Sequence, residues 1–182
     1  DDDASAERPA IKVVKVSSGS PGLSIQVMQP TKFVPEVPHA QLKFENLKIA
    51  DTAILPGDGY TKYVKPFRTV EDIHVNAAIV SYLTREAHRL DWPKNWIERA
   101  AALLASLQEL SRANPSAPET HIALAGALAI GGGLIAETGA FWEAAASDPA
   151  AERWKRDREL LKVAGGIRAQ RTKRAWESLR TT

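Results

Sequence analysis

The sequence predicts an α+β protein that is predominantly α-helical, with a small β-rich segment followed by an antiparallel four-helix bundle. Up to about residue 55, short runs of alternating apolar and polar residues are separated by Pro and Gly, which is typical of strands and turns. From about residue 69, apolar residues recur three and four positions apart, as on one face of a helix. We therefore expect two domains, residues 1–66 and 67–182.

Four strands are expected in the first domain. They are IKVVKV, LSIQVM, AQLKF and KIADTAIL, at residues 11–16, 23–28, 40–44 and 48–55. Turn-forming sequences separate or close them, namely SSGSPG before the second strand and PGDG after the last. Three prolines at residues 29–38 predict an extended connection, because proline removes a backbone donor from a sheet.

Four helices are expected in the second domain, and capping residues indicate where they begin. Thr69–Asp72 and Ser116–Glu119 resemble capping boxes, while Asp91 and Asp148 are suited to cap the second and fourth helices. The second helix carries its apolar stripe at Trp96, Ala100, Leu103, Leu107 and Leu110. Long helices with short connections predict antiparallel neighbours.

The third helix is apolar almost all round and is expected to be the most buried one. Gly126 and residues 131–133 would each weaken it by about 1 kcal/mol, so we expect a neighbouring backbone to approach closely there, or a local break. The run Gly131-x-Gly133-x-x-Ala136 matches a loose dinucleotide fingerprint, but the segment before it is helical in pattern, which favours helix packing.

The composition excludes several kinds of site. Without cysteine there are no disulfides, thiolate metal sites or cysteine nucleophiles, and a reducing, cytoplasmic location is expected. The four histidines are scattered, so no metal site is expected. The longest uncharged apolar run, Ile122–Ala136, has fifteen residues, whereas a membrane span needs about twenty, so no span is expected.

The last predicted helix is strongly basic. From Glu152 onward ten Lys and Arg residues stand against four Asp and Glu residues. A solvated face is the most common role for such a surface; phosphate groups of a cofactor come second, and nucleic acid is the least favoured partner. Trp154 and Trp176, like the other large aromatics, are expected in the core.

Several short motifs occur in an order that resembles the acyl-CoA dehydrogenase family. They are Pro21-Gly22-Leu23, Leu42-Lys43-Phe44-Glu45-Asn46-Leu47, Leu55-Pro56-Gly57-Asp58-Gly59 and Glu152-Arg153-Trp154-Lys155-Arg156-Asp157. The resemblance covers residues 19–180, which are similar to the second half of the family's middle β-domain and its C-terminal helical bundle. The family's N-terminal helical domain has no counterpart in this chain.

The resemblance implies an oxidoreductase that uses FAD to oxidise the Cα–Cβ bond of an acyl-CoA thioester. It implies a homo-oligomer formed through the helical bundle. It also implies that Arg89 contacts the FAD pyrophosphate of a neighbouring subunit, that Trp92 keeps the family's aromatic position, and that Gly139 lies near the adenosine. Pro93 stands where the family has glycine, a departure within the same motif.

The same resemblance implies that Glu71, with Asp72 beside it, is at the position of a catalytic base that removes the proton α to the thioester. An alternative follows from the residues themselves, because acidic side chains favour a helix N-terminus through the helix dipole. A second function from another class therefore stays open: a non-catalytic helical binding or interaction module derived from this family.

Overall fold

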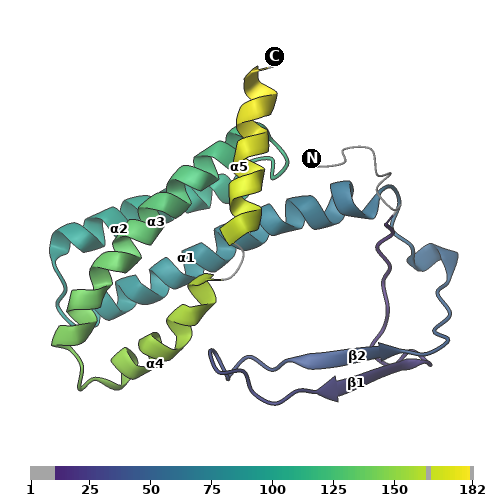
Figure 1. Cartoon of the computed structure of the whole chain (residues 1–182), viewed down its shortest axis with the longest axis horizontal. Coiled ribbons are helices and arrows are strands. Elements are labelled where there is room, and N and C mark those ends of the chain that lie inside the picture. The colour runs from purple at the N-terminus through teal and green to yellow at the C-terminus, as the bar shows by residue number, and fades with distance from the viewer. Residues whose placement is uncertain (1–10, 163–164, 181–182) are drawn as a thin grey trace, which may run out of the picture. The chain divides into compact units, whose positions relative to one another are not determined.

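The computed structural model describes residues 11–162 and 165–180, and within them the protein is mostly helical with one small antiparallel sheet (Figure 1). The chain forms two compact units. One comprises the residues up to Thr31 together with Pro35–Pro66, and the other comprises Lys32–Val34 and the residues from Phe67 onward. The first unit contains the sheet and the second contains nearly all of the helical residues.

The sheet is a hairpin of β1 (Leu23–Val27) and β2 (Ala40–Phe44), which confirms two of the four expected strands. The register places Leu23 opposite Phe44 and Ile25 opposite Leu42, so the alternating apolar residues of both strands share one face. Gly22 precedes β1 with a positive φ of 88°, and a Cβ there would lie 2.4 Å from the Glu45 carbonyl oxygen. Glycine is therefore required at this turn.

The expected strands at residues 11–16 and 48–55 are wrong. They meet at a single bridge between Val14 and Ile54, flanked by hydrogen bonds from Lys15 N to the Ala53 carbonyl and from Leu55 N to the Val13 carbonyl. A 3-10 turn at Asp51–Ala53 takes these residues out of the extended conformation. The alternating β-branched residues suit a strand, but this turn limits the pairing of the two segments to a single bridge.

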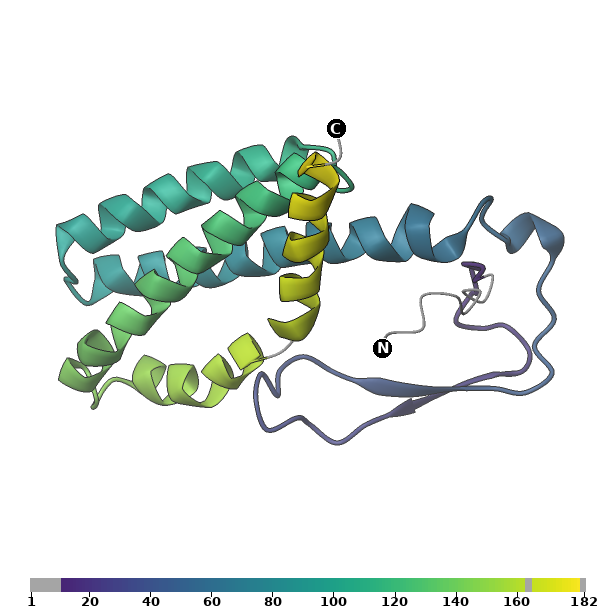
Figure 2. The ribbon, with the colours of Figure 1, turned by 45° about the horizontal axis from the view of Figure 1, so that its top comes forward.

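The described part of the chain contains five α-helices in place of the four expected (Figures 1 and 2). They are α1 (Lys65–Arg89), α2 (Lys94–Arg112), α3 (Pro118–Ala144), α4 (Pro149–Asp157) and α5 (Gly165–Arg180). The predicted last helix is divided, because α4 gives way to a 3-10 turn at Arg158–Lys162. Gly165 and Gly166, poor helix formers, stand at the beginning of α5. In both views α2 and α3 run side by side, and α5 crosses α3.

The first helix begins earlier than its sequence predicts. A π-helical turn at Tyr60–Val64 leads directly into α1, and the Asp58 carboxylate accepts hydrogen bonds from the Thr61 backbone N–H and hydroxyl, both at 2.8 Å. Asp58 therefore caps the start of this helical run by accepting a hydrogen bond from a free backbone N–H. The sequence predicted that Thr69 would be the cap. Thr69 instead lies inside α1, where it is fully buried beside His121.

The other three predicted helix starts differ in outcome. Neither α2 nor α3 has a side-chain cap: α2 follows Pro93 and α3 follows Ala117. Asp91 has a positive φ of 57° and lies in the turn before α2, so its predicted capping role is wrong, as is that of Ser116. Asp148 is confirmed, because its carboxylate accepts a hydrogen bond from the Ala150 backbone N–H at 2.8 Å and Pro149 follows as the first helical residue.

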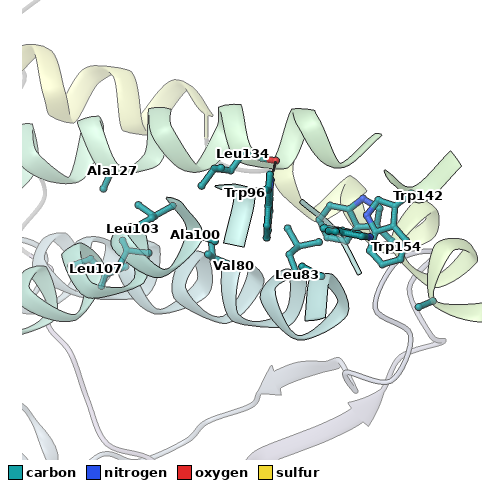
Figure 3. Close-up of a cluster of buried hydrophobic side chains, with 14 of the residues drawn as sticks. Val80, Leu83, Trp96, Ala100, Leu103, Leu107, Ala127, Leu134, Trp142 and Trp154 are labelled. Atoms are coloured by element: carbon teal, nitrogen blue, oxygen red, sulfur yellow. Dashed lines mark hydrogen bonds between the residues drawn. The ribbon is translucent and has the colours of Figure 1, made fainter. Parts of the chain in front are cut away.

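Buried side chains from α1, α2, α3 and α4 form the core of the helical unit (Figure 3). The predicted stripe of α2 is confirmed, with Trp96 almost completely buried and donating its indole N–H to the Leu134 carbonyl at 3.0 Å. Trp154 is also buried as expected, but Trp176 is 51% exposed. Adjacent residues on a helix lie about 100° apart, so burial of Ala175 in α5 turns Trp176 outward.

The third helix buries one stripe rather than its whole surface. The buried residues are Thr120, His121, Leu124, Ala127, Gly131, Leu134, Thr138 and Trp142. The helix is not broken, and a Cβ at Gly126, Gly132 or Gly133 would meet nothing within 4 Å. Gly131 is in contact with a side chain only, because its Cβ would lie 3.4 Å from Leu103, so among the described residues no neighbouring backbone closely approaches these glycines. By length and composition alone, α3 also meets the criterion for a membrane-crossing helix, a criterion that core helices of soluble proteins pass as well.

Candidate functional site

Two neighbouring carboxylates of α1, Glu71 and Asp72, have different surroundings. Asp72 is buried and accepts hydrogen bonds from the Arg168 guanidinium at 2.9 and 2.7 Å, and it pairs with Arg171 at 2.9 Å. Glu71 is exposed, and within the part of the chain that the structure describes no side chain pairs with it. Asp72 therefore joins α1 to α5, and Glu71 is the carboxylate of the two that is free for chemistry.

Glu71 lies at one end of an elongated depression along α1, which we call the α1 groove. Its smaller part, about 130 Å³, is lined by Glu71, Asp72, Val75, Asn76, Ile79, Leu160, Leu161 and Arg168. Its larger part, about 280 Å³, is lined by Val34, Ala78, Ile79, Tyr82, Trp154, Asp157, Arg158, Leu160 and Leu161. The two parts share three aliphatic side chains and therefore adjoin, so the groove runs from a polar end to a mostly apolar one.

Aromatic rings form part of the apolar end of the α1 groove. The rings of Tyr82 and Trp154 stack with their centroids 6.2 Å apart. Burial raises the pKa of the Tyr82 hydroxyl, so this side chain is uncharged at neutral pH. Asp157 accepts a hydrogen bond from Arg156 and another from the Val34 backbone N–H at 2.7 Å, and these bonds hold its pKa below the usual range. The Asp157 carboxylate thus fixes the Val34 segment against the end of α4.

The predicted phosphate ligand Arg89 is engaged with carboxylates of this chain. Its guanidinium donates to Glu86 at 2.8 Å and to both oxygens of Asp148 at 2.7 and 2.9 Å. Hydrogen bonds from Arg89 and then from Ala150 N lower the pKa of Asp148 to about 2. Burial alone would raise the pKa of Glu86, but hydrogen bonds from Arg85 and Arg89 outweigh it and the pKa lies below its usual range. Arg89 therefore binds an oxyanion in this structure, and that anion is a protein carboxylate.

The other predicted cofactor ligands do not lie around Arg89 as a flavin site would require. Trp92 is only 6% exposed and packs against the rings of Trp96, Phe141 and Trp142, with centroids 5.0–5.3 Å away. Gly139 lies within α3, where a Cβ would meet nothing within 4 Å. Trp92 is thus a core residue, while Gly139 leaves open space beside the helix.

The structure also separates the predicted catalytic residue from the predicted cofactor residues. Glu71 and Arg89 are eighteen positions apart on the same helix, which corresponds to about 27 Å along its axis. Among the residues predicted from the sequence, Arg89 alone has a geometry that fits a cofactor phosphate, because a carboxylate already occupies that position. The residues present in one chain do not fit a flavin ring, since Trp92 is enclosed by the core.

Two further functional side chains, Arg168 and Arg171, were not singled out from the sequence. They belong to the basic last segment, for which a solvated face is the commonest role, yet Arg171 is only 9% exposed. Their spacing of three residues places both on one helix face, and this spacing is the feature of the sequence from which a shared partner could have been predicted. That this face meets Asp72 depends on the crossing of α1 and α5, which no local pattern encodes.

Comparison of the chain with protein-family models, with curated proteins and with solved structures found no match. Among the described residues, no group of three or more His, Asp or Glu side chains is arranged to hold a metal ion.

Proposed function

We propose that this chain is an acyl-CoA dehydrogenase-like protein, in which the α1 groove accommodates the acyl chain of a CoA thioester and Glu71 accepts the proton from its Cα. The observation that carries the proposal is the groove itself, which is polar beside Glu71 and apolar beyond Ile79. An acyl thioester has the same polarity, with a polar carbonyl end and an apolar chain. The motif order from Pro21 to Asp157 supports the same family.

The size of the α1 groove favours a small acyl group. Its apolar part, about 280 Å³, is near the lower limit of ligand pockets, which is about 300 Å³. Tyr82 and Trp154 line it with flat, uncharged surface. Short aliphatic or aromatic acyl chains suit this lining better than long ones.

Asp72 and Arg168 have positioning roles in this proposal. The ion pair between them stabilises the polar end of the α1 groove beside Glu71. Asp72 is held by ion pairs with Arg168 and Arg171, so its role in this proposal is structural. The described residues of one chain do not form a flavin-ring site, so the part of FAD that this chain would contact is its phosphates, at Arg89, in exchange for the Asp148 carboxylate.

Flavin retention tests the cofactor part of the proposal. Purified protein is mixed with FAD, desalted, and examined for the visible absorption of bound flavin. Arg89→Ala and Asp148→Asn both remove the Arg89–Asp148 ion pair, but only the first removes the phosphate ligand. Asparagine is as good a helix cap as aspartate, so α4 keeps its start. We expect Arg89→Ala to weaken retention by about 1–3 kcal/mol and Asp148→Asn to preserve it.

Binding of acyl-CoA tests the groove. Ala78 is an exposed residue of the apolar part, so Ala78→Phe should fill this part without disturbing the core. We expect the variant to bind a short acyl-CoA more weakly while free CoA binds as before, measured by calorimetry. If Ala78→Phe weakens the binding of acyl-CoA and of free CoA equally, the proposed acyl groove is refuted. It is also refuted if the unmodified chain does not bind acyl-CoA in the presence of FAD.

The second candidate function is a non-catalytic helical binding module. It is favoured by a specific observation: Arg89 is saturated by Glu86 and Asp148, and Trp92 is enclosed in the core. This function predicts a protein that is colourless after desalting, and an Arg89→Ala variant that changes stability alone. The flavin experiment therefore separates the two candidates.

A further inference from the structure

Arg168 lines the polar end of the α1 groove together with Glu71. Its Nε and Nη2 atoms donate to a single oxygen of Asp72, Oδ1, at 2.9 and 2.7 Å. Among the described residues, its Nη1 group donates to no acceptor. A guanidinium has five N–H donors, so Arg168 can bind a further oxygen without releasing Asp72.

The charges around Asp72 leave one arginine in excess. Arg168 and Arg171 share this single carboxylate, and Arg171, whose side chain is only 9% exposed, pairs with its second oxygen at 2.9 Å. The Glu71 carboxylate lines the same end of the groove and balances the excess charge. The balance is kept when that negative charge moves from Glu71 to a substrate atom beside it.

Removal of a proton from Cα by Glu71 moves the charge in this way. The Cα–H bond breaks, the proton bonds to a Glu71 oxygen, and the electron pair left on Cα forms a double bond to the thioester carbon. The carbonyl π electrons move to the carbonyl oxygen, which becomes an enolate. This step needs no oxidant. A donor already aimed at the oxygen where charge develops stabilises the transition state of such a reaction.

We propose that Arg168 donates from Nη1 to the thioester oxygen and stabilises the enolate that forms there. This role rests on the proposed function, because it takes Glu71 as the base, and it makes Arg168 a catalytic residue as well as a link between α1 and α5. Hydrogen bonds to a charged acceptor are roughly twice as strong as neutral ones, so the contact favours the enolate over the carbonyl. The same donor should bind a carboxylate, whose charged oxygen resembles the enolate oxygen.

The second arginine on Asp72 allows this role to be tested without loss of the fold. In Arg168→Met the Asp72 carboxylate keeps its ion pair with Arg171, so α5 stays attached to α1. Arg158 is the matched control, because it is an exposed arginine that lines the apolar part of the groove. Arg158→Met therefore removes the same charge from the opposite end. Circular dichroism should show that both variants retain their helices.

Binding of phenylacetate, followed by NMR titration of the ligand, measures the contact without CoA or FAD. Its ring suits the lining of Tyr82 and Trp154, and its carboxylate stands in for the enolate oxygen. A ligand this small should bind with a Kd of about 1 mM.

We expect Arg168→Met to weaken phenylacetate binding by about ten-fold or more, since a hydrogen bond to a charged group is lost. Arg158→Met should leave this binding unchanged. Neutral phenylacetamide should be affected much less by Arg168→Met. Glu71→Gln removes the like charge at the polar end of the groove and should tighten phenylacetate binding.

The role of Arg168 would be overturned if the unmodified chain bound no phenylacetate, or if Arg168→Met left this binding unchanged or weakened phenylacetamide equally. A larger loss for Arg158→Met would also overturn it, by placing the carboxylate at the other end of the groove. Failure of the proposed function gives a different result. In that case acyl-CoA does not bind, whereas phenylacetate binding still depends on Arg168 and the anion contact stands.

Discussion

Replacement of Asp72 by alanine should destabilise the helical unit more than the loss of any surface ion pair. Asp72 is buried and neutralises Arg168 and Arg171, and Arg171 is itself only 9% exposed with no acceptor for its Nε–H. Removing one partner of a buried pair costs about 3–5 kcal/mol, because the other charge stays buried without compensation. For a chain of this size that corresponds to a fall in melting temperature of roughly 6–20 °C.

Urea unfolding followed by tryptophan fluorescence measures this effect. Glu109→Ala is the matched control, since it removes an exposed pair with Arg112 that should contribute at most about 1 kcal/mol. The double variant Asp72→Ala, Arg171→Met should recover part of the stability, because it leaves one fewer buried charge unpaired. A loss for Asp72→Ala no larger than that for Glu109→Ala would refute the claim that this pair fastens α5 to α1.

Three further perturbations address other parts of the molecule. Leu83→Ala should lower the free energy of unfolding by about 2–5 kcal/mol in the same urea assay, since Leu83 is completely buried. Because Arg89 lowers the folded-state pKa of Asp148 to about 2 from an ordinary 3.8, this pair stabilises the fold above about pH 4. That contribution should disappear as the pH falls from 4 to 2, and Asp148→Asn should remove this part of the acid dependence of the melting temperature. Gly22→Ala should weaken hairpin amide protection in hydrogen exchange, whereas Gly19→Ala, with nothing within 4 Å, should not.

The parts of the fold that follow from local chemistry could be predicted from the sequence. The α2 stripe from Trp96 to Leu107 is buried as its spacing indicates. Asp148 caps α4, as an acidic side chain directly before a proline in the first turn predicts. Thr69 failed as a cap because Asp58, eleven residues earlier, begins a helical run that continues through it. A capping residue begins a helix only when the residues before it are not already helical.

The candidate site shows a second limit of prediction from sequence, namely contacts between distant residues. The sequence placed Glu71 and Arg89 at functional positions by resemblance, and the structure gives each of them a distinct environment. It could not show that Asp148 would occupy the Arg89 guanidinium, because that contact joins residues fifty-nine positions apart. It also could not show that Gly126, Gly132 and Gly133 of α3 face open space, since the same run suits a tightly packed core helix equally well.

The hairpin and the third helix both carry exposed apolar side chains. All the apolar side chains of β1 and β2 are on one face, yet Val27 is 76% exposed and Phe44 57%. A two-stranded hairpin gains independent stability only when that face is covered by further strands or a helix. In α3, likewise, Ile130 is 58% exposed, and no described residue lies within 4 Å of a Cβ built at Gly126 or Gly133. Both surfaces are shaped by alternation or by helical spacing, as buried surfaces are, so the local sequence pattern alone does not distinguish an exposed apolar face from a covered one.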